Sequence, residues 1–171
     1  MKKLFMLAAF AAAACIGAEY RIEAWGMTIP EGSQWNRHYS GTLNGMADSS
    51  TKGSKLTGTY QIPAAGKYYI WVRTETRNEG WRQVQLSING KKIGKFGDKK
   101  VAGYTKPTLR WDKAMPILKI PDDGTEVKVE ITALQDIGRI DCVIFTTDPD
   151  FKPSNDDAEI VDGSEELELV E

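Results

Sequence analysis

Residues 56–74, which read LTGTYQIPAAGKYYIWVRT, decide the fold class of this 171-residue chain. From Tyr68 to Val72 every second side chain is apolar and shares one face of an extended segment, which is the period of a half-buried strand. Pro63 and Gly66 are turn formers, and they separate this strand from the alternating run before it. The stretch therefore predicts two strands joined by a turn.

The same period of two recurs farther along the chain, whereas helical spacing is nearly absent. Asn89-Gly90 ends one such run and predicts a hairpin, because both residues tolerate positive φ. Further strands are expected over 84–88, 93–96, 115–120, 127–131 and 139–146. Short strands joined by Gly, Pro and Asp turns predict an all-β domain, either a β-sandwich or a jelly roll. Two long polar connections, 28–55 and 97–112, interrupt the pattern and are expected to be functional loops.

The first 18 residues predict an export signal. Lys2 and Lys3 precede an apolar run that is shorter than the roughly 20 residues of a membrane-spanning helix. Cleavage after Ala18 would give a secreted or periplasmic protein without a stable transmembrane segment. Cys15, which follows Ala12, Ala13 and Ala14, offers a second processing route as the acylated N-terminus of a lipoprotein.

The other end of the chain is acidic and is expected to be a disordered tail over 154–171. From residue 156 onward there is no lysine or arginine, and the acidic residues are Asp156, Asp157, Glu159, Asp162, Glu165, Glu166, Glu168 and Glu171. The sequence therefore predicts one domain over 19–153. The positive excess of this domain is mild and dispersed, and no nucleic-acid motif accompanies it.

Candidate catalytic groups are sparse. His38 is the single histidine and has no nucleophile motif beside it, and Cys142 lies in an apolar run, where a buried inert thiol is expected. One histidine and one cysteine after cleavage also lack the spacing of a zinc site. Paired carboxylates for glycoside hydrolysis can be imagined, but carboxylates are too common in this chain to single out a pair. We therefore expect a protein without catalytic activity of its own.

Four segments resemble galactose-binding-like β-sandwich modules, and they occur in the family's order. Residues 60–73 are similar to the "Pro-x-x-Gly, Tyr-x-φ-x-Val-Arg" passage of these modules, and 84–90 to the strand and Asn-Gly turn that follow. Residues 139–148 are similar to their closing strand, and 20–24 resemble the opening strand of carbohydrate-binding modules of families 6 and 35. The resemblance implies a sandwich that binds polysaccharide or another glycan.

The resemblance also implies a structural calcium near the first and last strands, held in part by Glu23 and Asp141. Trp25 stands where the family often has a second carboxylate, which leaves backbone carbonyls and water to complete the six to eight oxygen ligands of calcium. The alternative is that the two carboxylates pair with Arg21 or Arg139.

Sugars are bound by aromatic rings that stack on the pyranose and by planar polar groups that bond to its hydroxyls. We expect this combination at three places in the loops. The expected stacking rings are Trp35, Trp81 and Trp111, and the expected hydroxyl-binding residues are Asn36, Arg37, Asn78 and Asp112. Each ring could instead cap the core, and Trp25 and Trp71 are expected to do so because they lie in strand-like runs.

These observations favour an exported, non-catalytic carbohydrate-binding module. A structural or adhesive envelope protein that binds protein partners through the sandwich is the main alternative, and it predicts an exposed apolar patch. An accessory chain of a polysaccharide-degrading system, active only with a companion, is a third possibility.

Overall fold

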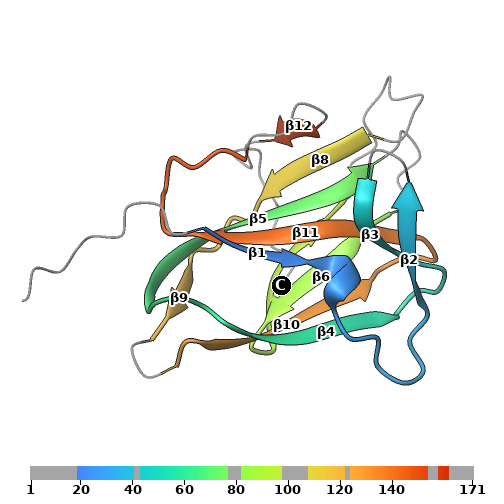
Figure 1. Ribbon diagram of the computed structural model, residues 1–171, viewed down its shortest axis with the longest axis horizontal. Coiled ribbons are helices and arrows are strands. Elements are labelled where there is room, and N and C mark those ends of the chain that lie inside the picture. Colours follow the sequence, from blue (N-terminus) through green and yellow to red (C-terminus); the bar gives the residue numbers. More distant parts are fainter. Residues whose placement is uncertain are drawn as a thin grey trace, which may run out of the picture.

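A computed structural model describes residues 19–40, 43–76, 82–97, 108–121, 124–153 and 158–161. Within these ranges the chain is built of strands and a single 3-10 turn (Figure 1). The elements are β1 (Glu19–Glu23), η1 (Ala24–Gly26), β2 (Trp35–Ser40), β3 (Leu43–Ser49), β4 (Lys55–Gln61), β5 (Gly66–Thr76), β6 (Val84–Ile88), β7 (Lys91–Phe96), β8 (Thr108–Lys113), β9 (Leu118–Ile120), β10 (Glu126–Ala133), β11 (Gly138–Thr146) and β12 (Ala158–Val161).

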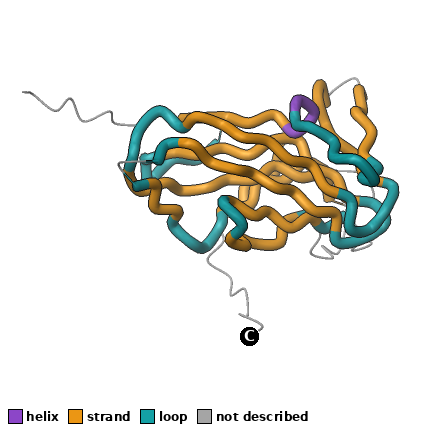
Figure 2. The backbone as a smooth tube through the Cα atoms, turned by 90° about the horizontal axis from the view of Figure 1, so that it is seen from below, coloured by secondary structure: helices purple, strands orange, loops and turns teal. Residues whose placement is uncertain are grey.

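The strands form two sheets. The eight-stranded sheet has the order β12-β8-β5-β11-β3-β2, with β1 paired to β11 and β9 to β5, and the four-stranded sheet has the order β4-β10-β6-β7. All pairs are antiparallel except β12 with β8. Figure 2 shows the strands running along the long axis, with most connections at its two ends. This arrangement confirms the prediction of an all-β sandwich.

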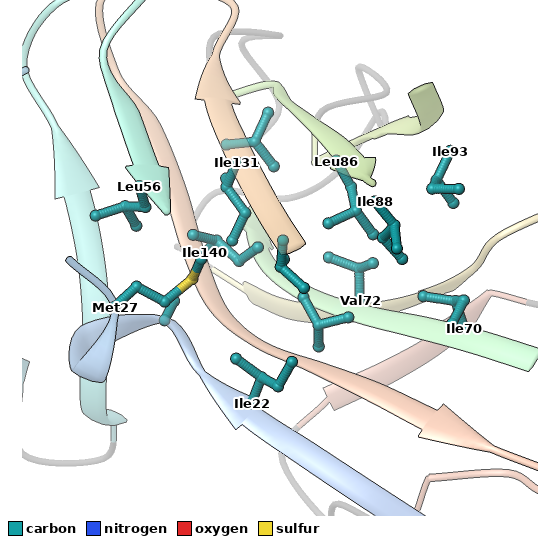
Figure 3. Close-up of a cluster of buried hydrophobic side chains, with 14 of the residues drawn as sticks. Ile22, Met27, Leu56, Ile70, Val72, Leu86, Ile88, Ile93, Ile131 and Ile140 are labelled. Atoms are coloured by element: carbon teal, nitrogen blue, oxygen red, sulfur yellow. The ribbon is translucent and has the colours of Figure 1, made fainter. Parts of the chain in front are cut away.

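The core lies between the two sheets. Leu86, Ile88 and Ile131 of the four-stranded sheet face Val72 and Ile140 of the larger sheet, and all five are buried (Figure 3). These residues occupy alternate positions of their strands, as the period of two predicts. The turn residues also behave as expected, since Asn89 and Gly90 both have positive φ between β6 and β7.

A second apolar cluster lies on the opposite face of the eight-stranded sheet. Trp71, Trp111, Cys142 and Ile144 are buried there, and Phe151 packs against them. Register places these residues away from the core, because Trp71 alternates with Ile70 and Val72, which face the other sheet. The segment that follows β11 therefore covers part of the outer face of this sheet.

The long connections are the main correction to the predicted fold. Trp35–Ser40 and Leu43–Ser49 form the hairpin β2–β3, and Thr108–Lys113 form β8, where the sequence predicted functional loops. These segments lack a clean apolar alternation, because polar side chains occupy both of their faces. They are nevertheless strands, since β3 pairs with β11 and β8 pairs with β5 through the backbone.

The predicted disorder of the acidic segment is wrong for Ala158–Val161, which form β12. This strand pairs in parallel with β8 and so satisfies backbone groups that an edge strand would leave open. The predicted export signal over 1–18, with Cys15, lies outside the described residues, as do 154–157 and 162–171.

Candidate functional site

Two of the three predicted stacking rings are buried. Trp35 of β2 is 5% exposed and belongs to the main core, and Trp111 of β8 is 1% exposed. The prediction that these rings lie open in loops is therefore wrong, because each belongs to a strand whose neighbours cover it. Trp81 and Asn78 lie outside the described residues.

The predicted polar residues are divided between different surfaces. Asn36 and Arg37 are exposed, but as neighbours in β2 they point to opposite faces of the sheet. Asp112 lies on β8, where its Oδ1 accepts hydrogen bonds from Nε and Nη2 of Arg110 at 2.8 and 2.6 Å. The structure therefore does not bring Asn36, Arg37 and Asp112 together as one site.

Trp25 is the exposed tryptophan that the sequence analysis assigned to the core. Its side chain is 40% exposed, and it is the only exposed aromatic ring among the residues whose side chains are described. It lies in η1, beside β3 and β2 in Figure 1, and Nε of Arg37 donates to its backbone carbonyl at 2.6 Å. The guanidinium of Arg37 is thus held at the backbone of the residue that carries an exposed indole, and sugar binding uses both kinds of group. The break in the Glu-Ala-Glu pattern at Trp25 was the available signal.

A hollow lies on the open face of the four-stranded sheet. Its volume is about 590 Å³, and it is lined by Thr28, Thr57, Gly58, Thr59, Ser87, Gly90, Lys92, Lys128, Val129 and Glu130. Most of these side chains are short or end in a hydroxyl, so the strands β4, β10 and β6 form an uncrowded floor that offers several hydroxyl groups. Nζ of Lys55 lies 3.1 Å from Oε2 of Glu130 and neutralises it. Among the described residues, Lys92 and Lys128 have no acidic partner.

Trp25 and the hollow are close along the chain. Thr28, at the edge of the hollow, exchanges two backbone hydrogen bonds of 2.9 Å with Thr57 of β4. Three residues span at most about 11 Å, so the Cα atom of Trp25 lies within that distance of Thr28. The backbone of an exposed tryptophan therefore lies close to the edge of the hollow.

The carboxylates predicted to hold calcium do lie together. Ligand atoms of Glu23, Asp141 and Cys142 are all within 4.8 Å of one another, at the junction of β1 and β11. Burial, with a further contribution from Asp141, raises the pKa of the Cys142 thiol far above its usual range, so the thiol stays protonated. Arg21 pairs with both carboxylates, as the alternative prediction had it. Arg139 does not, because it binds Asp48 and Glu75 instead.

Comparison of the sequence with protein-family models gives no match, and neither does comparison with curated proteins. Solved structures do match. One is the C-terminal family 6 carbohydrate-binding module of a laminarinase from Zobellia galactanivorans, with a TM-score of 0.55, 12% identity, and coverage of 76% of this chain and 100% of that one. Another is a family 35 module from Clostridium thermocellum, with a TM-score of 0.52, 15% identity, and coverage of 75% and 97%.

A third is a family 36 module in complex with calcium and xylotriose, with a TM-score of 0.50, 17% identity, and coverage of 75% and 99%. At these identities the likeness shows the fold alone. The chain therefore has the galactose-binding-like β-sandwich fold of carbohydrate-binding modules, as the resemblance predicted. Separately, no helix in the described ranges is long and apolar enough to cross a membrane.

Proposed function

We propose that this protein is a non-catalytic carbohydrate-binding module that holds a glycan over the hollow of the four-stranded sheet, with Trp25 at its rim. One observation carries the proposal: the exposed Trp25 lies three residues from Thr28, which lines the hollow, so its Cα atom lies within about 11 Å of that residue, on a fold used for glycan binding. We therefore propose Trp25, in place of the buried Trp35 and Trp111, as the ring that stacks on the sugar.

The chemistry of the hollow suits a saccharide. The hydroxyls of Thr57, Thr59 and Ser87 can each donate one hydrogen bond and accept others, as sugar hydroxyls do. The ammonium groups of Lys92 and Lys128 supply further donors. A flat ring at one side would let the ligand bury its CH face, while the floor satisfies its hydroxyls.

The remaining predicted binding residues stay predictions. Asn78 and Trp81 belong to the β5–β6 connection, and Asn36 and Asp112 lie on β2 and β8, away from the lining of the hollow. Export to the periplasm or cell surface also stays a prediction. It agrees with a role on extracellular polysaccharide, alone or as an accessory of a polysaccharide-degrading system.

Calorimetry with soluble oligosaccharides of different linkage, xylotriose among them, tests the proposal. We expect one oligosaccharide or more to bind the full chain, and Trp25→Ala to weaken that binding about fivefold or more, because stacking contributes about 1 kcal/mol. Thr59→Trp should abolish binding by filling the hollow with an indole, while the melting temperature stays close to that of the wild type because Thr59 is exposed.

Matched controls separate this site from others. Ile117→Ala removes an exposed apolar side chain outside the hollow and should leave affinity unchanged. Lys95→Trp adds an indole on β7, outside the hollow, and should bind the oligosaccharide with the same affinity as the wild type. Absence of binding heat with every oligosaccharide tested, or equal affinity for wild type and Thr59→Trp, would count against the hollow as the site.

A second candidate function is recognition of a protein partner. Met115 and Ile117 are exposed on either side of Pro116, between β8 and β9, and form a small apolar patch. This candidate predicts that a partner co-purifies with the wild-type chain and is lost from Met115→Ser/Ile117→Ser, while oligosaccharide binding is unaffected.

A further inference from the structure

The junction of β1, β5 and β11 contains two carboxylates and two guanidinium groups. Asp141 lies at a bulge of β11 and is 1% exposed, and Glu23 ends β1 directly beside it. A buried carboxylate must be balanced by a nearby positive charge, because moving an unpaired charge out of water is costly. At this junction the positive charge comes from a metal ion or from neighbouring basic side chains.

Two arginines, Arg21 and Arg73, supply the positive charge that balances these carboxylates. Nε of Arg73 donates to Oδ2 of Asp141 at 2.5 Å, and Nη2 of Arg21 lies 3.7 Å from the same oxygen. Nε of Arg21 also lies 2.6 Å from Oε1 of Glu23, so this one guanidinium bridges both carboxylates. The four groups sum to zero charge, and their charge-assisted contacts join the first strand to two central strands of the sheet.

The donor set does not fit calcium as it stands. Calcium takes six to eight oxygen ligands at 2.3–2.6 Å. The third group of the cluster is instead the Cys142 thiol, and Trp25 occupies the position of the expected second carboxylate. An added divalent ion would also face Arg21 and Arg73 at close range, since both guanidinium groups already contact the carboxylate oxygens.

We propose that Arg21 and Arg73 take the place of a structural calcium ion in this chain. The pair ties β1 to β11 and β5 at the point where the family resemblance implies a metal. Oδ1 of Asp141 is buried and has no hydrogen-bond partner among the described residues, so this carboxylate depends on the contacts of Oδ2. Among the residues of this junction, substitution of Arg73 should therefore lower the stability of the fold the most.

Thermal unfolding of the full chain tests the proposal without a variant. The melting temperature should be the same within about 1 °C in excess calcium chloride and in excess EGTA. A structural calcium present at a thousandfold over its Kd would instead raise the melting temperature by roughly 10 °C. A rise with calcium and a fall with the chelator would overturn the proposal.

Variants of Arg73 test the second half of the claim. Arg73→Met keeps the length of the side chain but removes its charge, and the melting temperature should fall by about 10 °C because a buried carboxylate is left unpaired. Arg73→Lys keeps a positive charge but lacks the planar guanidinium, so its melting temperature should fall by a smaller amount. If Arg73→Met does not fold, the graded loss in Arg73→Lys still decides the matter.

Lys55→Met is the matched control, because it breaks an ion pair of 3.1 Å with Glu130 on the exposed face of the other sheet. Exposed pairs contribute little, so its melting temperature should change by no more than about 2 °C. Equal losses for Lys55→Met and the two Arg73 variants would overturn the proposal, since the arginine would then be an ordinary surface charge.

Discussion

Gly97 shows how one residue fixes the end of a strand. It follows β7 with φ of +81°, and a Cβ atom built on it would lie 2.6 Å from the backbone carbonyl oxygen of Arg82. Arg82 precedes β6 and pairs with the buried carboxylate of Glu75, which also accepts hydrogen bonds from Arg139 at 2.7 and 3.0 Å. The close backbone approach at Gly97 therefore supports a buried ionic network.

Substitution of Gly97 by alanine should lower the free energy of unfolding by about 3 kcal/mol, from the positive φ and from the clash with Arg82 together. Gly53→Ala is the control, because Gly53 also has positive φ, at +85°, but has nothing within 4 Å of the added Cβ. It should cost about 1 kcal/mol. Urea unfolding measures both, and equal losses would show that the contact with Arg82 does not matter.

At the scale of elements, the strands that could be predicted are those with a simple alternation. Residues 68–74 and 84–88 alternate cleanly and are confirmed as parts of β5 and β6. β8 was missed because its inner face carries Arg110 and Asp112, an ion pair opposite Thr74 and Val72 of β5. Charged residues are normally expected to face solvent. A strand with a charge pair on its inner face therefore lacks the apolar alternation by which strands are predicted, and its sequence predicts a loop instead.

The site was harder to predict than the fold, for a related reason. Trp25 and Trp35 are equally apolar, and what separates them is the tertiary contact that covers one ring and leaves the other open. Such contacts join residues far apart in the chain, and no local period records them. Arg73 was likewise unpredictable as a partner of Asp141, because 68 positions separate them.

The segment after β11 acts as a cover for the outer face of the eight-stranded sheet. Phe151 packs on the cluster of Trp71 and Trp111, and Nζ of Lys113 donates to the carbonyl of Pro149 at 3.1 Å. The guanidinium of Arg73 lies 5.2 Å from the centroid of the Trp111 ring, and Lys113 lies 5.6 Å from the Trp71 ring. Cations and rings thus alternate beneath this segment.

Phe151→Ala should lower the free energy of unfolding by about 2 kcal/mol and shift tryptophan emission to longer wavelength, because both indoles gain contact with water. Ile117→Ala, on an exposed loop, should change stability by less than about 0.5 kcal/mol and leave the emission unchanged. An unshifted spectrum in Phe151→Ala would mean that other parts of the chain cover the rings.

For the whole molecule, the thiol of the buried Cys142 and the hydroxyl of the half-buried Tyr60 make the free energy of unfolding fall at alkaline pH. Burial raises the pKa of Tyr60 above 10.0 and that of Cys142 above 9.0 in the folded state. Above pH 9 the unfolded chain releases these protons while the folded chain keeps them, so the folded state binds more protons and stability falls as the pH rises.

We therefore expect the urea midpoint to fall between pH 8 and pH 10.5. The fall should be smaller in Cys142→Ala, which removes the first of the two groups, and smaller in Tyr60→Phe, which removes the second. Parallel pH dependences in the wild type and both variants would assign the alkaline loss to other groups.

The parallel pairing of β12 with β8 has a consequence for self-association. β12 contributes only four residues, Ala158–Val161, yet it forms one border of the larger sheet and covers the edge of the longer strand β8. A chain clipped by a protease after Pro153 would present a bare row of amide and carbonyl groups along β8. Such a row is a template for another polypeptide, so proteolytic trimming would turn a self-contained sandwich into one prone to dimers or fibrils.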